Sequence, residues 1–194
     1  MTEPWKLVGL LVAILLSLTA CGADDGAAGG DGRGFNDADV EFASTMIPHH
    51  AQALMMVDMT LGRPLDPKVQ ALAEDIRAAQ APEIETMVDW LQAWGKPVPE
   101  TPRDHANAHG DGMEMNSEVP GMMSSEDMQA LEHADGEQFQ RMWLEMMIEH
   151  HRGAIEIAQA ELEGGQFAPA IKLAERIEAA QEAQIATMQD LLGP

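Results

Sequence analysis

The chain is poor in several residue types on which whole classes of proteins depend. Among its 194 residues it has a single cysteine, Cys21, and no tyrosine, and aromatic residues make up only 4% of the sequence. The folded part therefore has no cysteine nucleophile, and no glycine loop of the kind that cradles phosphates occurs. Alanine, leucine, glutamate, glutamine and methionine, which all favour helices, dominate instead. An all-α fold is the first expectation.

Basic residues are scarce as well. Lysine and arginine together number 11 against 33 aspartate and glutamate residues, so the formal net charge is −22. Such a charge opposes binding to nucleic acid and to anionic lipid surfaces, and it raises the local concentration of cations. Most of these charges are expected to form an ordinary solvated surface. Nucleic acid is therefore not an expected partner.

Long apolar runs are also few. The run from Leu7 to Leu16 is too short for a comfortable transmembrane helix and suits the apolar region of a signal peptide. The sequence "LTAC" that ends at Cys21 resembles a bacterial lipobox, which implies cleavage before Cys21 and a lipid on its sulfur. We expect an exported lipoprotein anchored to the outer face of the cell membrane; an uncleaved anchor is the alternative.

Composition divides the chain into three parts. We expect a signal peptide at residues 1–20, a flexible Gly- and Asp-rich tether at 21–36 and a folded domain at 37–194. Helical periodicity and the positions of glycine and proline predict helices at about 38–60, 67–94, 137–163 and 168–192, with a short helix before Gly136. A connector rich in methionine and histidine occupies about 95–124.

An internal repeat organises the folded part. Shifting the chain by 101 residues places residues 46–91 on 147–192 without a gap, and 18 of the 46 positions are identical. A repeat this long is a duplicated helical hairpin rather than a solenoid unit. Two hairpins that bury their apolar stripes against each other form a four-helix bundle with pseudo-twofold symmetry.

The repeat carries two matched pairs of adjacent histidines with methionines one turn away. Imidazole and thioether are soft, uncharged ligands that suit copper, with Cu(I) favoured over Cu(II). Methionines on a helix stripe more often fill gaps in a core, whereas buried histidines at four matched positions need partners for their ring nitrogens. The candidate ligands are His49, His50, His150, His151, Met46, Met147, Met146 and Met56.

Two further features of the repeat concern the surroundings of the histidines. Gln80 and Gln181 are matched and interrupt apolar stripes, so we predict that they hydrogen-bond the free ring nitrogens of the histidines; a water-facing position at the stripe edge is the alternative. Pro48, whose partner in the repeat is Glu149, either kinks the first helix beside His49 or begins its main part.

The connector contains a second group of soft ligands. Exposed methionines in a loop rich in proline and glycine have no core to fill, so a lid or a low-affinity capture arm for copper is the functional interpretation, with plain disorder as its competitor. The residues concerned are His105, His109, Met113, Met115, Met122 and Met123.

The stretches "MIPHHAQALMM", "PGMMSSEDM" and "FQRMWLEMMIEHHRGAIEIA" resemble the family catalogued as domain of unknown function 305, over residues from about 36 to 192. The resemblance implies an exported, ferritin-like four-helix bundle, and several members are implicated in copper binding and copper resistance. It supports His49, His50, His150 and His151, with Met46 and Met147, as binding positions.

We therefore expect a copper-binding lipoprotein for sequestration or handover, not an enzyme. A copper-handling partner protein and an oligomer are both compatible with the sequence. One rival is a ferritin-like di-iron or di-manganese oxidase, but neither histidine-bearing helix contains the Glu-x-x-His that such a site needs. The other is a bundle that binds a protein partner without metal, in which case the histidines would be dispensable.

Overall fold

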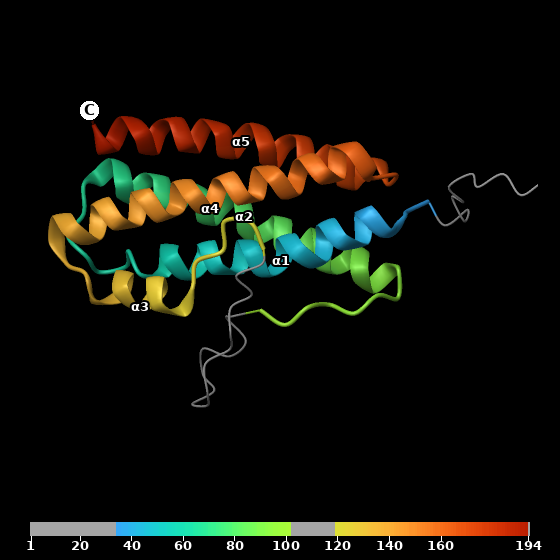
Figure 1. Cartoon of the computed structure of the whole chain (residues 1–194), viewed down its shortest axis with the longest axis horizontal. Helices are drawn as coiled ribbons and strands as arrows, with labels where there is room; N and C mark the ends of the chain where they lie inside the picture. Colours follow the sequence, from blue (N-terminus) through green and yellow to red (C-terminus); the bar gives the residue numbers. More distant parts are fainter. Residues whose placement is uncertain (1–33, 102–118, 194) are drawn as a thin grey trace, which may run out of the picture.

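The computed structural model describes residues 34–101 and 119–193, and the regular structure within these residues is entirely helical (Figure 1). Four long helices form the bundle, and the short α3 lies before the second hairpin. The elements are α1 (Asp37–Asp58), α2 (Pro67–Ala93), α3 (Ser125–His133), α4 (Gly136–Gly164) and α5 (Ala168–Leu192). The prediction of an all-α bundle is confirmed.

The helices begin where the sequence supplies caps. Asn36 accepts a hydrogen bond from the backbone N–H of Asp39, whose carboxylate accepts from the N–H of Asn36, so α1 begins with a capping box. Asp66 caps α2, with Pro67 at the first helical position. Pro48 lies inside α1, which decides the question of its position in favour of the helix interior.

The two hairpins, α1–α2 and α4–α5, pack through α1 and α4, which run antiparallel to each other (Figure 1). At one end the Asn36 side chain donates to the carbonyl of Gly164; at the other the Asp66 N–H donates to the side chain of Gln140. The start of α1 thus meets the end of α4, which is compatible with a pseudo-twofold axis that runs across the helices. The matched histidine pairs of α1 and α4 are therefore brought to the middle of the molecule.

A buried polar layer divides the interior into two apolar cores. One core includes Met56, Ile76 and Trp143, and the other includes Phe42, Leu91 and Ile177. Between them, every long helix contributes at least one polar side chain that is at most 3% exposed. The layer consists of His49, His50, Gln52, Gln80, His150, His151 and Gln181. Polar groups are rare at the centre of a helical bundle unless they are paired or bind a ligand.

A separate buried contact closes the end of the bundle where α1 begins. The Asp39 carboxylate, fully buried, accepts hydrogen bonds from the backbone N–H groups of Asn36, Gln166 and Phe167. Glu161, 1% exposed, lies beside it near the end of α4. Burial and the neighbouring Asp39 raise the pKa of Glu161 to about 8, so Glu161 is largely protonated at neutral pH.

No helix in the part of the chain that the structure describes is long and apolar enough to cross a membrane. The segment predicted as signal peptide, with Cys21, lies outside the described residues.

Candidate metal centre

The two histidine pairs meet at the interface of α1 and α4. The ring centroids of His49 and His150 are 3.9 Å apart, with the ring planes tilted by 43°. Adjacent residues on a helix point about 100° apart, so the second histidine of each pair faces elsewhere. His50 turns toward α2 and His151 toward α5. All four side chains are buried to 0% exposure, so the repeat builds one continuous cluster.

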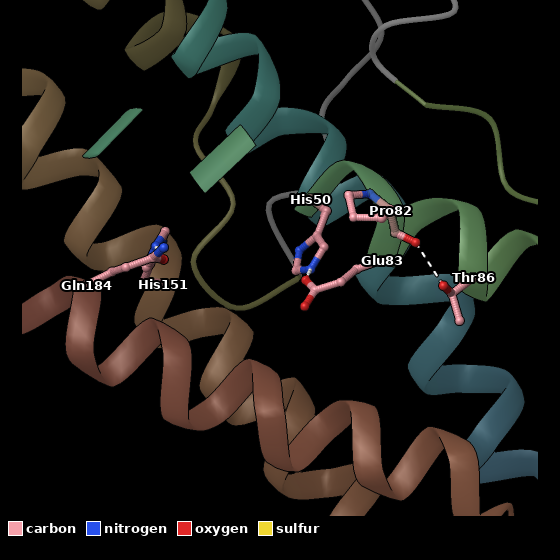
Figure 2. Close-up of polar contacts among 6 residues, drawn as sticks. All are labelled: His50, Pro82, Glu83, Thr86, His151 and Gln184. Carbon is pink, nitrogen blue, oxygen red and sulfur yellow. Dashed lines mark hydrogen bonds and ion pairs between the residues drawn. The ribbon is translucent and has the colours of Figure 1, made fainter. Parts of the chain in front are cut away.

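The outer histidines are held by side chains at matched positions of the two hairpins (Figure 2). His50 Nε2 lies 2.8 Å from Glu83 Oε2, and His151 Nε2 lies 2.8 Å from Gln184 Oε1. In both hairpins the partner follows the histidine by 33 residues. The geometry is thus repeated, although the partner is a carboxylate in one hairpin and an amide in the other.

The inner histidines, His49 and His150, are treated differently from each other. His49 Nε2 lies 3.0 Å from the carbonyl oxygen of Pro120. Among the described residues, neither ring nitrogen of His150 has a hydrogen-bond partner. His150 is therefore the member of the cluster with the most unused capacity to bind a ligand.

These partners select one tautomer of three histidines. Carbonyl and carboxylate oxygens accept hydrogen bonds, so each Nε2 that faces one carries the proton, and each Nδ1 is left with a lone pair. The Nδ1 atoms of all four histidines are buried and have no partner among the described residues. An unsatisfied buried polar atom costs about 1–3 kcal/mol, and lone pairs gathered in this way are what a metal ion would satisfy.

The pKa values of His49, His150 and His151 favour their neutral forms. Burial, together with the neighbouring histidines, lowers the pKa of His49 to about 3 and that of His151 to about 4. The pKa of His150 is also lowered well below its ordinary value, first by burial and then by His49. Neutral imidazole is the form that binds metal ions. Protons therefore compete little with a metal at neutral pH.

The candidate methionines are placed on both sides of the cluster. Met46 and Met147, each three residues before an inner histidine, are fully buried in different apolar cores. Met56 is also buried, among apolar residues of one core, and its carbonyl accepts a hydrogen bond from the Trp143 indole. Met146 is partly buried against the same core. Met46 and Met147 keep matched positions beside the histidines.

The end of the connector crosses the cluster as a strap, residues 119–123. The strap includes Pro120, whose carbonyl faces His49. The Gln52 side chain grips the strap by accepting from the N–H of Met123 and donating to its carbonyl. On the other helix Gly153 meets it backbone to backbone: a Cβ at Gly153 would lie 2.1 Å from the Pro120 oxygen. Only glycine fits this approach.

The hydrogen bonds predicted for Gln80 and Gln181 are not formed. Both side chains are buried in the polar layer, 2% and 3% exposed, but no hydrogen bond between described residues joins either to a histidine. The residue of α2 that meets His50 is instead Glu83, three positions further along the helix. Gln80 instead keeps both amide atoms without a partner in the described residues.

Glu83, Gln184 and Pro120 are the site residues that reasoning from sequence missed. The signal for the first two was the alignment of the repeat, in which Glu83 falls on Gln184. Gln80 and Gln181 are identical in that alignment, whereas Glu83 and Gln184 differ. Of the connector residues, Met122 and Met123 belong to the strap and are partly buried. His105, His109, Met113 and Met115 lie outside the described residues.

Within residues 34–101 and 119–193, no group of three or more His, Cys, Asp or Glu side chains is arranged to hold one metal ion. A site built from two imidazoles and completed by thioether sulfurs is compatible with this result, because methionine is not among those residue types. The arrangement thus differs from a carboxylate-rich metal site.

Solved structures with the same fold include two that are named as DUF305 proteins. A DUF305 protein from Streptomyces coelicolor, named as a candidate secreted protein, is 33% identical with a TM-score of 0.68, covering 80% of this chain and 91% of that chain. A DUF305 fragment from Deinococcus radiodurans is 30% identical with a TM-score of 0.69, covering 81% and 97%. CopM in its Cu(I)-bound form is 28% identical with a TM-score of 0.62, covering 79% and 94%.

CopM has also been solved in Cu(II)-bound and silver-bound forms. A comparison with curated protein sequences finds no match. The sequence pattern of domain of unknown function 305 matches residues 39–192, which include both histidine pairs, and this protein therefore belongs to that family.

Proposed function

We propose that this protein binds copper in its buried histidine cluster and serves in copper sequestration or handover. The observation that carries the proposal is the meeting of four buried histidines from both repeats, each with an Nδ1 atom that has no partner among the described residues. An apo cluster of this kind leaves several polar groups desolvated without compensation. Metal binding by imidazoles of the cluster, completed by thioether sulfur, would satisfy some of these groups.

The ligand chemistry favours copper, with Cu(I) preferred. The ligands are His49, His50, His150 and His151, with Met46 and Met147 as thioether donors and Met146 and Met56 as weaker candidates. Neutral imidazole and thioether suit a soft monovalent ion. The relatives solved with Cu(I), Cu(II) and silver support the same choice. The connector residues from His105 to Met123 serve as a lower-affinity capture arm.

A binding function fits the site better than oxidase chemistry. A di-iron or di-manganese centre needs several converging carboxylates. In the part of the chain that the structure describes, the polar layer holds histidine and glutamine, and Glu83 at its edge is the carboxylate bonded to a histidine. The buried Glu161 lies at the end of the bundle beside Asp39, away from the histidines.

We further propose that the protein is exported and held at the outer face of the membrane by a lipid on Cys21. The lipobox-like sequence before Cys21 supports this location. The relative from Streptomyces coelicolor, named as a candidate secreted protein, supports export. A net charge of −22 would gather cations around a protein held there.

A chelator-competition titration with Cu(I) and with Cu(II) tests the proposal. We expect the variant His49→Ala/His50→Ala/His150→Ala/His151→Ala to bind both Cu(I) and Cu(II) much more weakly than the wild type does. His133→Ala is a matched control, because His133 is exposed on α3 outside the layer. Equal copper affinities for the wild type and a folded four-histidine variant would refute the proposal.

A further inference from the structure

The two hairpins hold their outer histidines with the same geometry and different charge. His50 and His151 each present Nε2 to an oxygen 2.8 Å away, and in each hairpin this oxygen comes from the side chain 33 residues later. The oxygen belongs to the Glu83 carboxylate in one case and to the neutral Gln184 amide in the other (Figure 2). The two contacts therefore differ mainly in the charge of the partner side chain, so one hairpin can be compared directly with the other.

The adjoining helix turns are matched as well. Thr86 Oγ1 donates to the carbonyl of Pro82 at 2.8 Å, and Thr187 Oγ1 donates to the carbonyl of Ala183 at 3.0 Å. These carbonyls belong to the residues just before Glu83 and Gln184. The backbone that carries the two partners is thus held in the same way in both hairpins, and the side-chain charge is the chief difference.

A carboxylate behind a metal-binding histidine changes the metal that the histidine prefers. It draws the Nε2 proton toward itself, which makes Nδ1 a stronger electron donor, and it adds a negative charge near the ion. Both effects stabilise a doubly charged ion more than a singly charged one. The effect persists here because His50 is fully buried and the Glu83 side chain is only 18% exposed. An amide partner orients the ring without adding charge.

Gln184 borders a cavity on its outer side. It lines a cavity of about 460 Å³ between α2 and α5, together with Lys68, Asp75 and Asp190. Water in such a cavity would screen a charge placed at position 184. A carboxylate introduced there is therefore expected to act more weakly than the native one at Glu83.

We propose that Glu83 and Gln184 are positioning residues that set the preference of the shared histidine cluster for one oxidation state of copper. Glu83, acting through His50, shifts this preference toward Cu(II), whereas the neutral Gln184, acting through His151, leaves it nearer Cu(I). This inference rests on the proposed function, since it concerns copper bound at the same cluster.

Separate competition titrations with Cu(I) and Cu(II) on charge-swapped variants test the inference. Glu83→Gln should weaken Cu(II) binding about tenfold while changing Cu(I) binding less than about threefold, because an outer partner of a metal ligand typically affects affinity by 10–100-fold. A tenfold change in the ratio of the two affinities raises the reduction potential of the bound copper by about 59 mV. Gln184→Glu should shift the ratio the opposite way by a smaller factor, and Glu83→Gln/Gln184→Glu should bring it back toward the wild type.

Glu85→Gln is the matched control, since it removes one charge from an exposed position two residues further along α2. It should leave the ratio unchanged, and thermal melting of each metal-free variant reports any structural damage. Copper binding by the wild type with the same Cu(I)-to-Cu(II) ratio in Glu83→Gln and Gln184→Glu would overturn the inference and leave the proposed function standing. A wild type that binds Cu(I) and not Cu(II) would also overturn it. A wild type that binds neither ion would overturn both.

Discussion

The two hairpins of this bundle share a layout and differ in chemistry. Each places a histidine pair on its first helix and a polar partner for the outer histidine on its second. Residues that pack or cap diverge more freely: Pro48 inside α1 corresponds to Glu149 in α4, where the side chain pairs with Arg152. The comparison teaches that the positions of the histidines were kept while their surroundings were specialised.

The strap explains part of this difference. A single segment that crosses near a twofold axis cannot make the same contacts with both halves. The strap therefore offers a carbonyl to His49, and the structure shows no such partner for His150 among the described residues. Gln52 hydrogen-bonds to the strap through its side chain, whereas Gly153 contacts the strap through its backbone, although these two positions correspond in the repeat.

Removal of one histidine pair at a time tests most strongly whether the two hairpins contribute to the same site. Because the rings of His49 and His150 are in contact, we expect a shared site rather than one site per hairpin. The variants His49→Ala/His50→Ala and His150→Ala/His151→Ala should each lose more than about 100-fold in Cu(I) affinity, beyond the 10–100-fold typical of an outer partner. Titration of copper against a competing chelator measures the loss.

Stoichiometry in the same titration separates the alternatives. If each hairpin held an independent ion, either double variant would keep half of the bound copper at the wild-type affinity. That result would contradict a shared cluster. Unchanged far-ultraviolet circular dichroism of each variant ensures that the loss belongs to the site.

The strap contacts provide a second test, with a smaller effect. Gly153→Ala places a Cβ 2.1 Å from the Pro120 oxygen, so the strap must move, and we expect the free energy of unfolding to fall by about 1–3 kcal/mol. Gln52→Leu leaves the N–H and carbonyl of Met123 without their partner, at a cost of about 1–3 kcal/mol. Urea denaturation of the metal-free protein measures both.

The exposed Gly62 is the control for the first substitution, since nothing lies within 4 Å of a Cβ built there, although its φ of 74° adds a backbone cost. If Gly153→Ala were no more destabilising than the same change at Gly62, the close contact with the strap would be unimportant. The difference between the hairpins would then rest on the Gln52 hydrogen bonds to the strap and not on the backbone contact at Gly153.

Matched positions near the end of the first helix of each hairpin carry different residues. Position 161 is a buried glutamate, and its counterpart is Thr60, whose hydroxyl donates to the carbonyl of Val57. The pKa of Glu161 is raised from 4.5 to about 8, so the folded state favours the protonated form. Stability from this group is complete below pH 4.5 and is lost as the pH rises through 8.

The metal-free wild type should therefore melt at a lower temperature at pH 9 than at pH 6. Glu161→Gln, which keeps the hydrogen-bonding shape without a titratable proton, should reduce this difference. Differential scanning calorimetry across that range measures it. An equal decline in both proteins would show that other groups cause the pH dependence.

Much of the fold could be predicted from the sequence. The matched histidines and apolar stripes imply two hairpins, and the predicted helix at 168–192 has the observed bounds. The caps Asn36 and Ser124 depend only on residues a few positions apart. Periodicity and capping are local properties, so one sequence is sufficient to reveal them.

The partners of the histidines were less predictable. Which residue of α2 lies level with His50 depends on the path of the turn between the helices, and the residue that meets His50 is Glu83, three positions beyond the predicted Gln80. The contact between the Pro120 carbonyl and His49 could not be predicted for a different reason. The path of a connector leaves no periodic pattern in the sequence. Contacts between two helices depend on how far one helix is shifted along the other, and this shift is set by side-chain packing.

The position of the histidine cluster has a consequence for the chain as a whole. A protein with one cysteine cannot form an internal disulfide. An ion held by both His49 and His150 would join positions 101 residues apart, and in the unfolded chain a covalent link of that span removes conformational freedom worth on the order of 4–5 kcal/mol. Copper would then be a reversible cross-link as well as cargo, and its release would return that freedom to the chain.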